Sequence, residues 1–352
     1  MIKINLHTKS FETDYIDKLY KYLYPKLEQA CTDKKYKVEN AKTLYYKTKS
    51  EQKIIDVLLY IKDNLEDILK SDLTSLRILQ NQIKLKHGKK YKRTKKIEEY
   101  KLYSIVYKIF VLEGYEQRIC SSEDKKIAYD IVKDLGLTTC PYCNRNFITS
   151  IRKDENKYKK TTRPQLDHFI SKSKFPFLAC SLYNLVPSCS TCNLLKSDDK
   201  NDNLISPFEL DSSKFNFKYK LTKEFQFGKD NSDGIELKIL GNFDANKETF
   251  LLEELYNTHK YVISDILNKA YEHPKEYAKD LFTFKMASGE QLISLNDIVK
   301  SLYSEYLSEN EIYNIMYGTE LSQDEFFRRP LSKLTYDVLS QKGLLDNLGK
   351  DE

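Results

Sequence analysis

The apolar positions of the first 136 residues recur at helical spacing. In residues 51–70 they follow one another in steps of three and four, which is the spacing of one helix face: Ile54, Leu58, Ile61, Leu65 and Ile68. Similar patterns predict helices over residues 73–85, 97–119 and 123–135. A first helix is expected to begin at a Ser10 cap and to end near Pro25, because proline breaks the hydrogen-bond ladder of a helix. Residues 1–136 are therefore predicted to form a helical domain.

The pattern changes to alternation after residue 206. Apolar residues occupy every second position in three short runs between residues 215 and 239, which predicts three antiparallel strands with turns near Lys223 and at residues 231–234. Residues 247–271 return to helical spacing and predict one long amphipathic helix. Residues 206–352 are thus expected to be a C-terminal domain made of a β-meander and helices.

Residues 137–205 separate these two regions and carry two Cys-x-x-Cys pairs. Cys140 and Cys143 form the first pair, and Cys189 and Cys192 form the second. Four thiolates satisfy the tetrahedral preference of Zn²⁺, so the spacing predicts a structural zinc site. The alternative is four unrelated buried cysteines. The other cysteines, Cys31, Cys120 and Cys180, lack such spacing and are expected to be ordinary thiols.

The segment between the two pairs is longer than the usual ~15–20 residues and carries polar residues of chemical interest. Asp167 and His168 are adjacent, Asn184 follows, and Asn193 comes directly after the last cysteine. An Asp-His pair on its own would be interpreted as a buried ion pair or a surface turn. Its position between the two cysteine pairs favours a catalytic role.

The order Cys-x-x-Cys, Asp-His, Asn-Leu-Val, Cys-x-x-Cys-Asn-x-x-Lys resembles the HNH endonuclease family, in the branch with a zinc-stabilised ββα-metal core. The resemblance covers roughly residues 138–200. It implies a central ββα-metal core built on a zinc site of four cysteines. Together with the patterns of the flanking regions, this predicts a mainly α fold with a small β component, in which the core is flanked by helical domains and a short antiparallel β-meander.

The resemblance also implies a role for each residue of the motif. Asp167 and Asn193 would hold one Mg²⁺ or Mn²⁺ through oxygen atoms, which hard cations prefer. His168, on the opposite side of the same strand, would be the general base. Asn184 would hold either the His168 ring or the local backbone, and Lys196 would contact a phosphate. Many HNH enzymes have histidine where this chain has Asn193, so the preferred metal stays open.

Two basic stretches could contact nucleic acid. Residues 84–96 contain eight Lys or Arg and no acidic residue, and residues 152–163 include Lys160 and Arg163. Each stretch is either a solvated loop or a surface that contacts phosphates. The net charge of +6 is mild and does not by itself imply a nucleic-acid partner.

These observations predict a metal-dependent HNH endonuclease that hydrolyses phosphodiester bonds in DNA, with RNA as an open alternative. The arrangement looks like anti-phage nucleases such as the HNH subunits of Septu-type systems, which work beside an ATPase. A restriction enzyme, a homing enzyme or a toxin would have the same chemistry. The alternative from another class is a zinc-stabilised module that binds nucleic acid or protein without catalysis.

The cellular compartment is predicted from what the sequence lacks. The first residues contain no apolar leader, and no run of ~18 apolar residues would span a membrane. The paired cysteines suit a reducing compartment, so a cytoplasmic protein without membrane contact is expected. No Walker-type glycine-rich loop is present, so NTP hydrolysis would have to come from a partner subunit.

Overall fold

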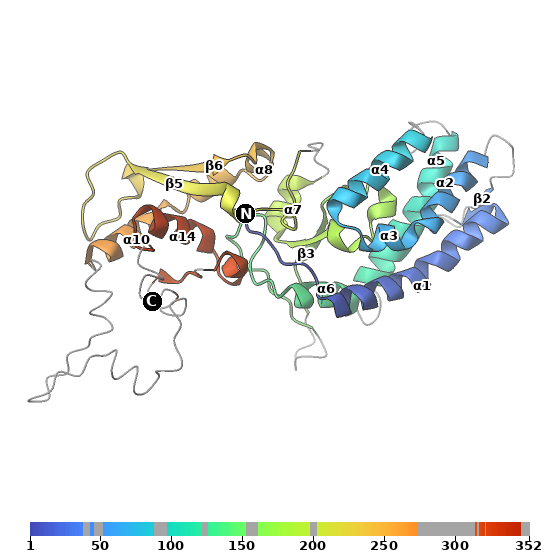
Figure 1. Ribbon diagram of the computed structural model, residues 1–352, viewed down its shortest axis with the longest axis horizontal. Coiled ribbons are helices and arrows are strands. Elements are labelled where there is room, and N and C mark those ends of the chain that lie inside the picture. Colours follow the sequence, from blue (N-terminus) through green and yellow to red (C-terminus); the bar gives the residue numbers. More distant parts are fainter. Residues whose placement is uncertain are drawn as a thin grey trace, which may run out of the picture.

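The computed structural model describes residues 1–37, 43–45, 52–87, 97–121, 126–152, 161–197, 203–272, 314, 317–320 and 322–345. Within these residues the chain is mainly helical and contains three two-stranded antiparallel sheets. Figure 1 shows the N-terminal helices at one end of an elongated molecule and the β5–β6 sheet with the C-terminal helices at the other. The segment that carries β3 and α7 lies between them.

The N-terminal region is built from helices that bury one apolar stripe each. Its elements are α1 (Lys9–Asp33), β1 (Lys35–Lys37), β2 (Thr43–Tyr45), α2 (Gln52–Asp63), α3 (Leu65–Lys70), α4 (Leu73–His87), α5 (Ile97–Val106), the π-helix η4 (Tyr107–Cys120) and α6 (Lys126–Leu135). In α1 the buried residues Tyr15, Leu19, Leu23 and Leu27 follow one another every four positions, which places them on one face.

Two helix boundaries differ from those expected. Thr8, not Ser10, caps α1, since its side chain accepts a hydrogen bond from the Phe11 N–H. The helix also continues through Pro25 to Asp33, because the face beyond the proline is still buried against the core. The single helix expected over residues 51–70 is divided at Asn64 into α2 and α3.

The π-helix η4 brings the N-terminal helices against the central segment. Gly114 is needed there, since a Cβ on it would lie 2.6 Å from the Cys180 Sγ. The next residue, Tyr115, donates its hydroxyl to the Leu166 carbonyl oxygen at 3.0 Å. The wider turn of a π-helix is uncommon and often occurs at functional sites.

The central segment folds as two strands followed by a helix. Its elements are β3 (Gln165–His168), η6 (Pro176–Leu178), η7 (Leu182–Asn184), β4 (Leu185–Ser188) and α7 (Ser190–Lys196). β3 and β4 are antiparallel, with Asp167 opposite Val186 and His168 opposite Leu185. This order agrees with the two strands and one helix that the motif predicted between residues 137 and 205.

The C-terminal region contains a two-stranded sheet instead of the three-stranded meander that the alternation suggested. Its elements are η8 (Ser212–Lys214), β5 (Phe215–Leu221), η9 (Ser232–Gly234), β6 (Ile235–Gly241), α8 (Asp244–Thr249), α9 (Leu252–Asn257), α10 (Lys260–Glu272), η10 (Gln323–Arg328) and α14 (Ser332–Gln341). The expected middle strand is a loop, because the Asn231 side chain bonds the backbone of Gln226 and Lys229. Phe227 is exposed in this loop.

The long helix expected over residues 247–271 is also interrupted. Leu251 has a left-handed backbone with φ of 48°, which separates α8 from α9, and a second break separates α9 from α10. The breaks turn the chain so that Phe250, Leu252 and Tyr256 are all buried. Tertiary packing therefore overrides the helical spacing of the sequence.

The open edge of β5 is covered by side chains of α14. Asp337 accepts a hydrogen bond from the Phe217 N–H at 2.8 Å, and Gln341 bonds both backbone groups of Tyr219. Asp337 also pairs with Lys333, at 2.7 and 2.9 Å, and both side chains are almost fully buried. The Asp337 carboxylate thus accepts a hydrogen bond from the backbone at a strand edge and also pairs with a buried ammonium group.

Replacing Asp337 by asparagine should destabilise the protein by about 3 kcal/mol, because the Lys333 ammonium would stay buried without its counter-charge. The measurement is urea-induced unfolding followed by circular dichroism. Glu236→Gln is the matched control, since it removes a carboxylate from the exposed Glu236–Lys238 pair and should leave the unfolding midpoint unchanged. Equal midpoints for the two variants would contradict a structural role for the buried pair.

Candidate active site and metal centre

The four paired cysteines form one compact cluster. Their sulfur atoms all lie within 4.8 Å of one another, and all four residues are buried. Four sulfurs bound at about 2.3 Å to one zinc ion lie about 3.8 Å apart, so the cluster fits a tetrahedral site. Among the described residues it is the one group of three or more His, Cys, Asp or Glu that could hold a metal ion.

The local backbone explains how each pair presents its sulfurs. The first knuckle turns at Asn144, which has a left-handed φ of 48° and donates its N–H to the Cys140 carbonyl at 2.7 Å. In the second knuckle Cys189 is the N-cap of α7, and its sulfur accepts from the Cys192 N–H at 3.5 Å. The Asn146 amide also donates to the Cys189 sulfur, at 3.3 Å.

The electrostatics of the cluster are compatible with a bound cation. Burial raises the pKa of the Cys140 thiol well above its usual range. Four adjacent thiolates would repel one another in this buried setting, and a divalent cation bound between them removes that repulsion. Cys31, Cys120 and Cys180 lie outside the cluster, as their lack of spacing predicted; the Cys180 thiol donates to the Phe110 carbonyl.

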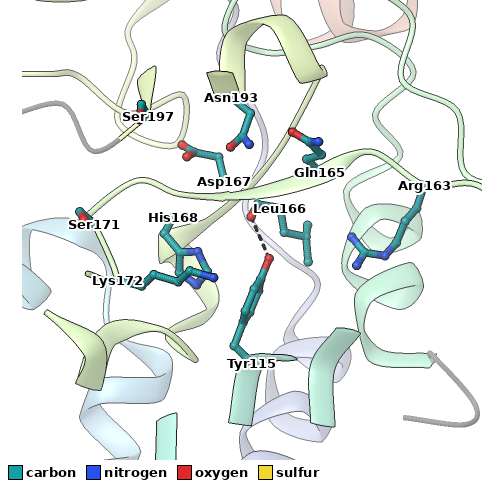
Figure 2. A pocket seen from close by; sticks show the side chains of 10 residues that line it. All are labelled: Tyr115, Arg163, Gln165, Leu166, Asp167, His168, Ser171, Lys172, Asn193 and Ser197. Atoms are coloured by element: carbon teal, nitrogen blue, oxygen red, sulfur yellow. Dashed lines mark hydrogen bonds between the residues drawn. The ribbon is translucent and has the colours of Figure 1, made fainter. Parts of the chain in front are cut away.

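A pocket of about 440 Å³ lies along β3. Its lining consists of Tyr115, Arg163, Gln165, Leu166, Asp167, His168, Ser171, Lys172, Asn193 and Ser197. Figure 2 shows the Asp167 carboxylate and the Asn193 amide on one side of β3, with the His168 ring on the other. Three of the four predicted catalytic residues therefore line one cavity, and the two adjacent ones face opposite sides of the strand.

Asp167 is almost fully buried and accepts hydrogen bonds from two side chains. The Tyr142 hydroxyl donates to Oδ2 at 2.6 Å, and the Lys196 ammonium lies 3.1 Å from Oδ2 and 3.2 Å from Oδ1. Burial, followed by the nearby carboxylate, raises the pKa of Tyr142 well above its usual range. Tyr142 therefore keeps its proton and acts as a donor at any working pH.

Lys196 lies in the interior instead of at the surface where a phosphate contact was expected. Its side chain is 3% exposed, and its ammonium donates to the His168 carbonyl oxygen at 2.8 Å as well as to Asp167. This one side chain thus connects helix α7 to the end of β3. The lysine fixes two neighbouring residues of the site relative to the helix.

His168 is held in one tautomer by the backbone. Its Nε2 lies 3.1 Å from the Ala179 carbonyl oxygen, and because a carbonyl can only accept, Nε2 carries the proton and Nδ1 carries the lone pair. The edge of the ring packs against Tyr115, with ring centroids 4.3 Å apart at 70°. The imidazole is therefore oriented by both a hydrogen bond and an aromatic contact.

Asn184 holds the backbone, which is one of the two roles considered for it. Its Oδ1 accepts from the Ile170 N–H at 2.6 Å, and its Nδ2 donates to the carbonyls of Ile170 and Leu178 at 3.1 and 3.0 Å. The Phe169 N–H also donates to the Asn184 carbonyl. Asn184 thus fixes the loop that leaves β3 directly after His168.

Two cations line the pocket on the solvent side. Arg163 donates to the Pro164 carbonyl, and the Lys172 ammonium lies 4.6 Å from the centroid of the Tyr115 ring. Lys172 also approaches Glu116 at 3.6 Å. Of the predicted basic stretches, residues 84–87 belong to α4, whereas residues 88–96 and Lys160 lie outside the described residues.

Sequence reasoning did not identify Tyr115, Tyr142 or Lys172 as site residues. Tyr115 belongs to a helix whose apolar pattern indicates only core packing. Tyr142 occupies a variable position inside the first Cys-x-x-Cys pair, where its spacing from Asp167 carries no signal. A lone lysine after the Asp-His pair is equally uninformative.

Comparison of the chain with protein-family models, with curated proteins and with solved structures finds no match. In the part of the chain that the structure describes, every helix is too short or too polar to cross a membrane.

The purified protein should contain one zinc ion per chain, measured by plasma mass spectrometry. Cys189→Ser should lose most of that zinc and unfold at a lower temperature, because structural zinc contributes its binding free energy to folding. Cys120→Ser is the control, since Cys120 is half-buried and outside the cluster. Equal zinc contents in the two variants would show that the cluster is not a metal site.

Proposed function

We propose that this chain is a metal-dependent endonuclease of the HNH type that hydrolyses phosphodiester bonds in DNA. The observation that carries the proposal is the arrangement along β3. Asp167 and His168 occupy adjacent positions on opposite sides of the strand, and Asn193 from α7 joins Asp167 in the same pocket. The resemblance to HNH enzymes implied a pair of strands followed by a helix, together with a four-cysteine cluster.

His168 is the proposed general base. The Nε2–H···O bond to Ala179 leaves Nδ1 as the basic nitrogen, and the Tyr115 ring limits rotation of the imidazole. Nδ1 would take a proton from the water that attacks the phosphorus atom. A base fixed in the correct tautomer contributes typically 10²–10⁴-fold to the rate.

Asp167 and Asn193 would hold one Mg²⁺ or Mn²⁺. A carboxylate and an amide supply the oxygen donors that these ions prefer, and Mg²⁺ usually keeps several waters when few protein groups bind it. Such an ion neutralises the scissile phosphate and stabilises the leaving oxygen. The zinc ion proposed for the four cysteines would be structural.

Arg163 and Lys172 are the proposed contacts to the substrate backbone. Both line the pocket, and a cation near a phosphate adds affinity by releasing counterions. Lys196 is better described as a structural partner of Asp167, because its ammonium is directed inward. DNA is the proposed substrate, and RNA would meet the same groups.

A second candidate is a zinc-stabilised binding module without catalysis. The observation in its favour is the buried Lys196–Asp167 pair, since an aspartate already paired with a cation has less need of a metal ion. Two observations favour the nuclease: a hydrogen bond fixes the tautomer of His168, and the candidate catalytic residues line the same pocket. A role in anti-phage defence beside an ATPase subunit is proposed only from the resemblance.

His168→Ala should reduce plasmid cleavage in Mg²⁺ or Mn²⁺ by at least about 100-fold, because it removes the base, while zinc content and circular dichroism stay unchanged. EDTA should stop the wild-type reaction. His259→Gln is the matched control: His259 accepts a hydrogen bond from Arg145 and lies outside the pocket, so this variant should cleave at the wild-type rate.

The substrate panel contains plasmid, single-stranded DNA and RNA. Cleavage by His168→Ala at the wild-type rate would contradict the assignment of the base. Absence of cleavage by the wild-type protein on every substrate, with each metal, would favour the binding module instead.

A further inference from the structure

Two side chains, one within the first Cys-x-x-Cys knuckle and one on the helix that follows the second, donate hydrogen bonds to the same carboxylate. Tyr142 lies between Cys140 and Cys143 in the first knuckle, and Lys196 lies at the end of the helix that begins at the second knuckle. Both donors reach Asp167, from different segments of the chain. We call this arrangement, Tyr142 and Lys196 on Asp167, the carboxylate clamp.

We propose that Tyr142 is a positioning residue that, within the carboxylate clamp, orients Asp167 to receive a divalent cation. The inference rests on the proposed function, because it concerns the same pocket. It adds a residue that the motif does not contain. It also implies that the proposed zinc site directly supports the proposed second metal site, through the Tyr142 side chain that lies between Cys140 and Cys143.

The contacts of Tyr142 suit this role. The residue is fully buried, and its backbone is fixed by the turn of the first knuckle. Its ring stacks on Phe250, with centroids 4.5 Å apart and planes 22° apart. The Tyr142 side chain is thus held both by the knuckle backbone and by Phe250 of the C-terminal region, so its hydroxyl donates from a fixed position.

The chemistry explains why a hydroxyl is needed. A phenylalanine would fill almost the same space, and a buried hydroxyl is favourable only where it has a partner. The partner here is Oδ2 of Asp167, at 2.6 Å. Without that hydroxyl, the attraction of the Lys196 ammonium, which lies 3.1 Å from Oδ2 and 3.2 Å from Oδ1, would no longer be opposed by a neutral donor on Oδ2. A carboxylate drawn to an internal cation is a poorer ligand for an external one.

The test compares two buried tyrosines of similar environment. Tyr142→Phe removes the hydroxyl that donates to Asp167, whereas Tyr256→Phe removes a hydroxyl that donates at the same 2.6 Å distance to the Cys143 carbonyl of the same knuckle. Both tyrosines are fully buried. The pair therefore separates an effect on the carboxylate from a general effect on the knuckle.

The readout is Mn²⁺ binding to the zinc-loaded full chain, measured by electron paramagnetic resonance of free Mn²⁺. Tyr142→Phe should bind Mn²⁺ roughly 10–100-fold more weakly, as is typical when a residue that orients a metal ligand is lost. Its zinc content should be unchanged, and excess Mn²⁺ should restore cleavage. Tyr256→Phe should bind Mn²⁺ as the wild type does.

Equal Mn²⁺ affinities for Tyr142→Phe and the wild type would overturn the proposal, and so would an equal loss in both variants. A wild-type protein that binds no Mn²⁺ at all would overturn it as well, since Asp167 would then hold no cation. If the wild type binds Mn²⁺ but cleaves nothing, the proposed function fails, while the affinity comparison still decides the role of Tyr142.

Discussion

The cluster of four buried cysteines is the constraint on which the rest of the structure depends. Its first knuckle is also the point where distant segments meet. The Asn144 side chain donates to the Phe326 and Arg329 carbonyls and accepts from the Lys333 N–H. These hydrogen bonds attach the start of α14 to the first knuckle. The Ile2 N–H donates to the Pro141 carbonyl. A small central segment can thus hold two larger regions, because hydrogen bonds from its first knuckle reach both of them.

The same cluster determines the position of the candidate site residues. Cys189 caps α7, which carries Asn193 and Lys196 on successive turns, so gathering the four cysteines into one cluster brings both side chains towards β3. Asp167 then lies between a lysine and a tyrosine that come from different knuckles. The Lys196 ammonium offsets the cost of burying the carboxylate, and the neutral Tyr142 donor stabilises it without adding a second positive charge.

Sequence patterns predicted the parts of this structure that depend on local spacing. The two Cys-x-x-Cys pairs and the helices of the N-terminal region follow from short-range spacing, whereas the opposite orientations of Asp167 and His168 were expected only from the resemblance to HNH enzymes. The break at Leu251 could not be predicted, because it exists to bury Phe250 and Tyr256 against residues more than a hundred positions away. The interior position of Lys196 depends likewise on where β3 ends relative to α7.

The flanking regions have a common relation to the site, although their sequences carry no motif. From the N-terminal side, η4 places the Tyr115 ring against His168. From the C-terminal side, the loop between α8 and α9 places Phe250 against Tyr142, which in turn bonds Asp167. Each region therefore supports one of the two adjacent residues through an aromatic ring. Because the two regions lie on opposite sides of the central segment (Figure 1), a shift of either one would displace His168 or Asp167 separately, and both regions must be in place for the arrangement along β3 to form.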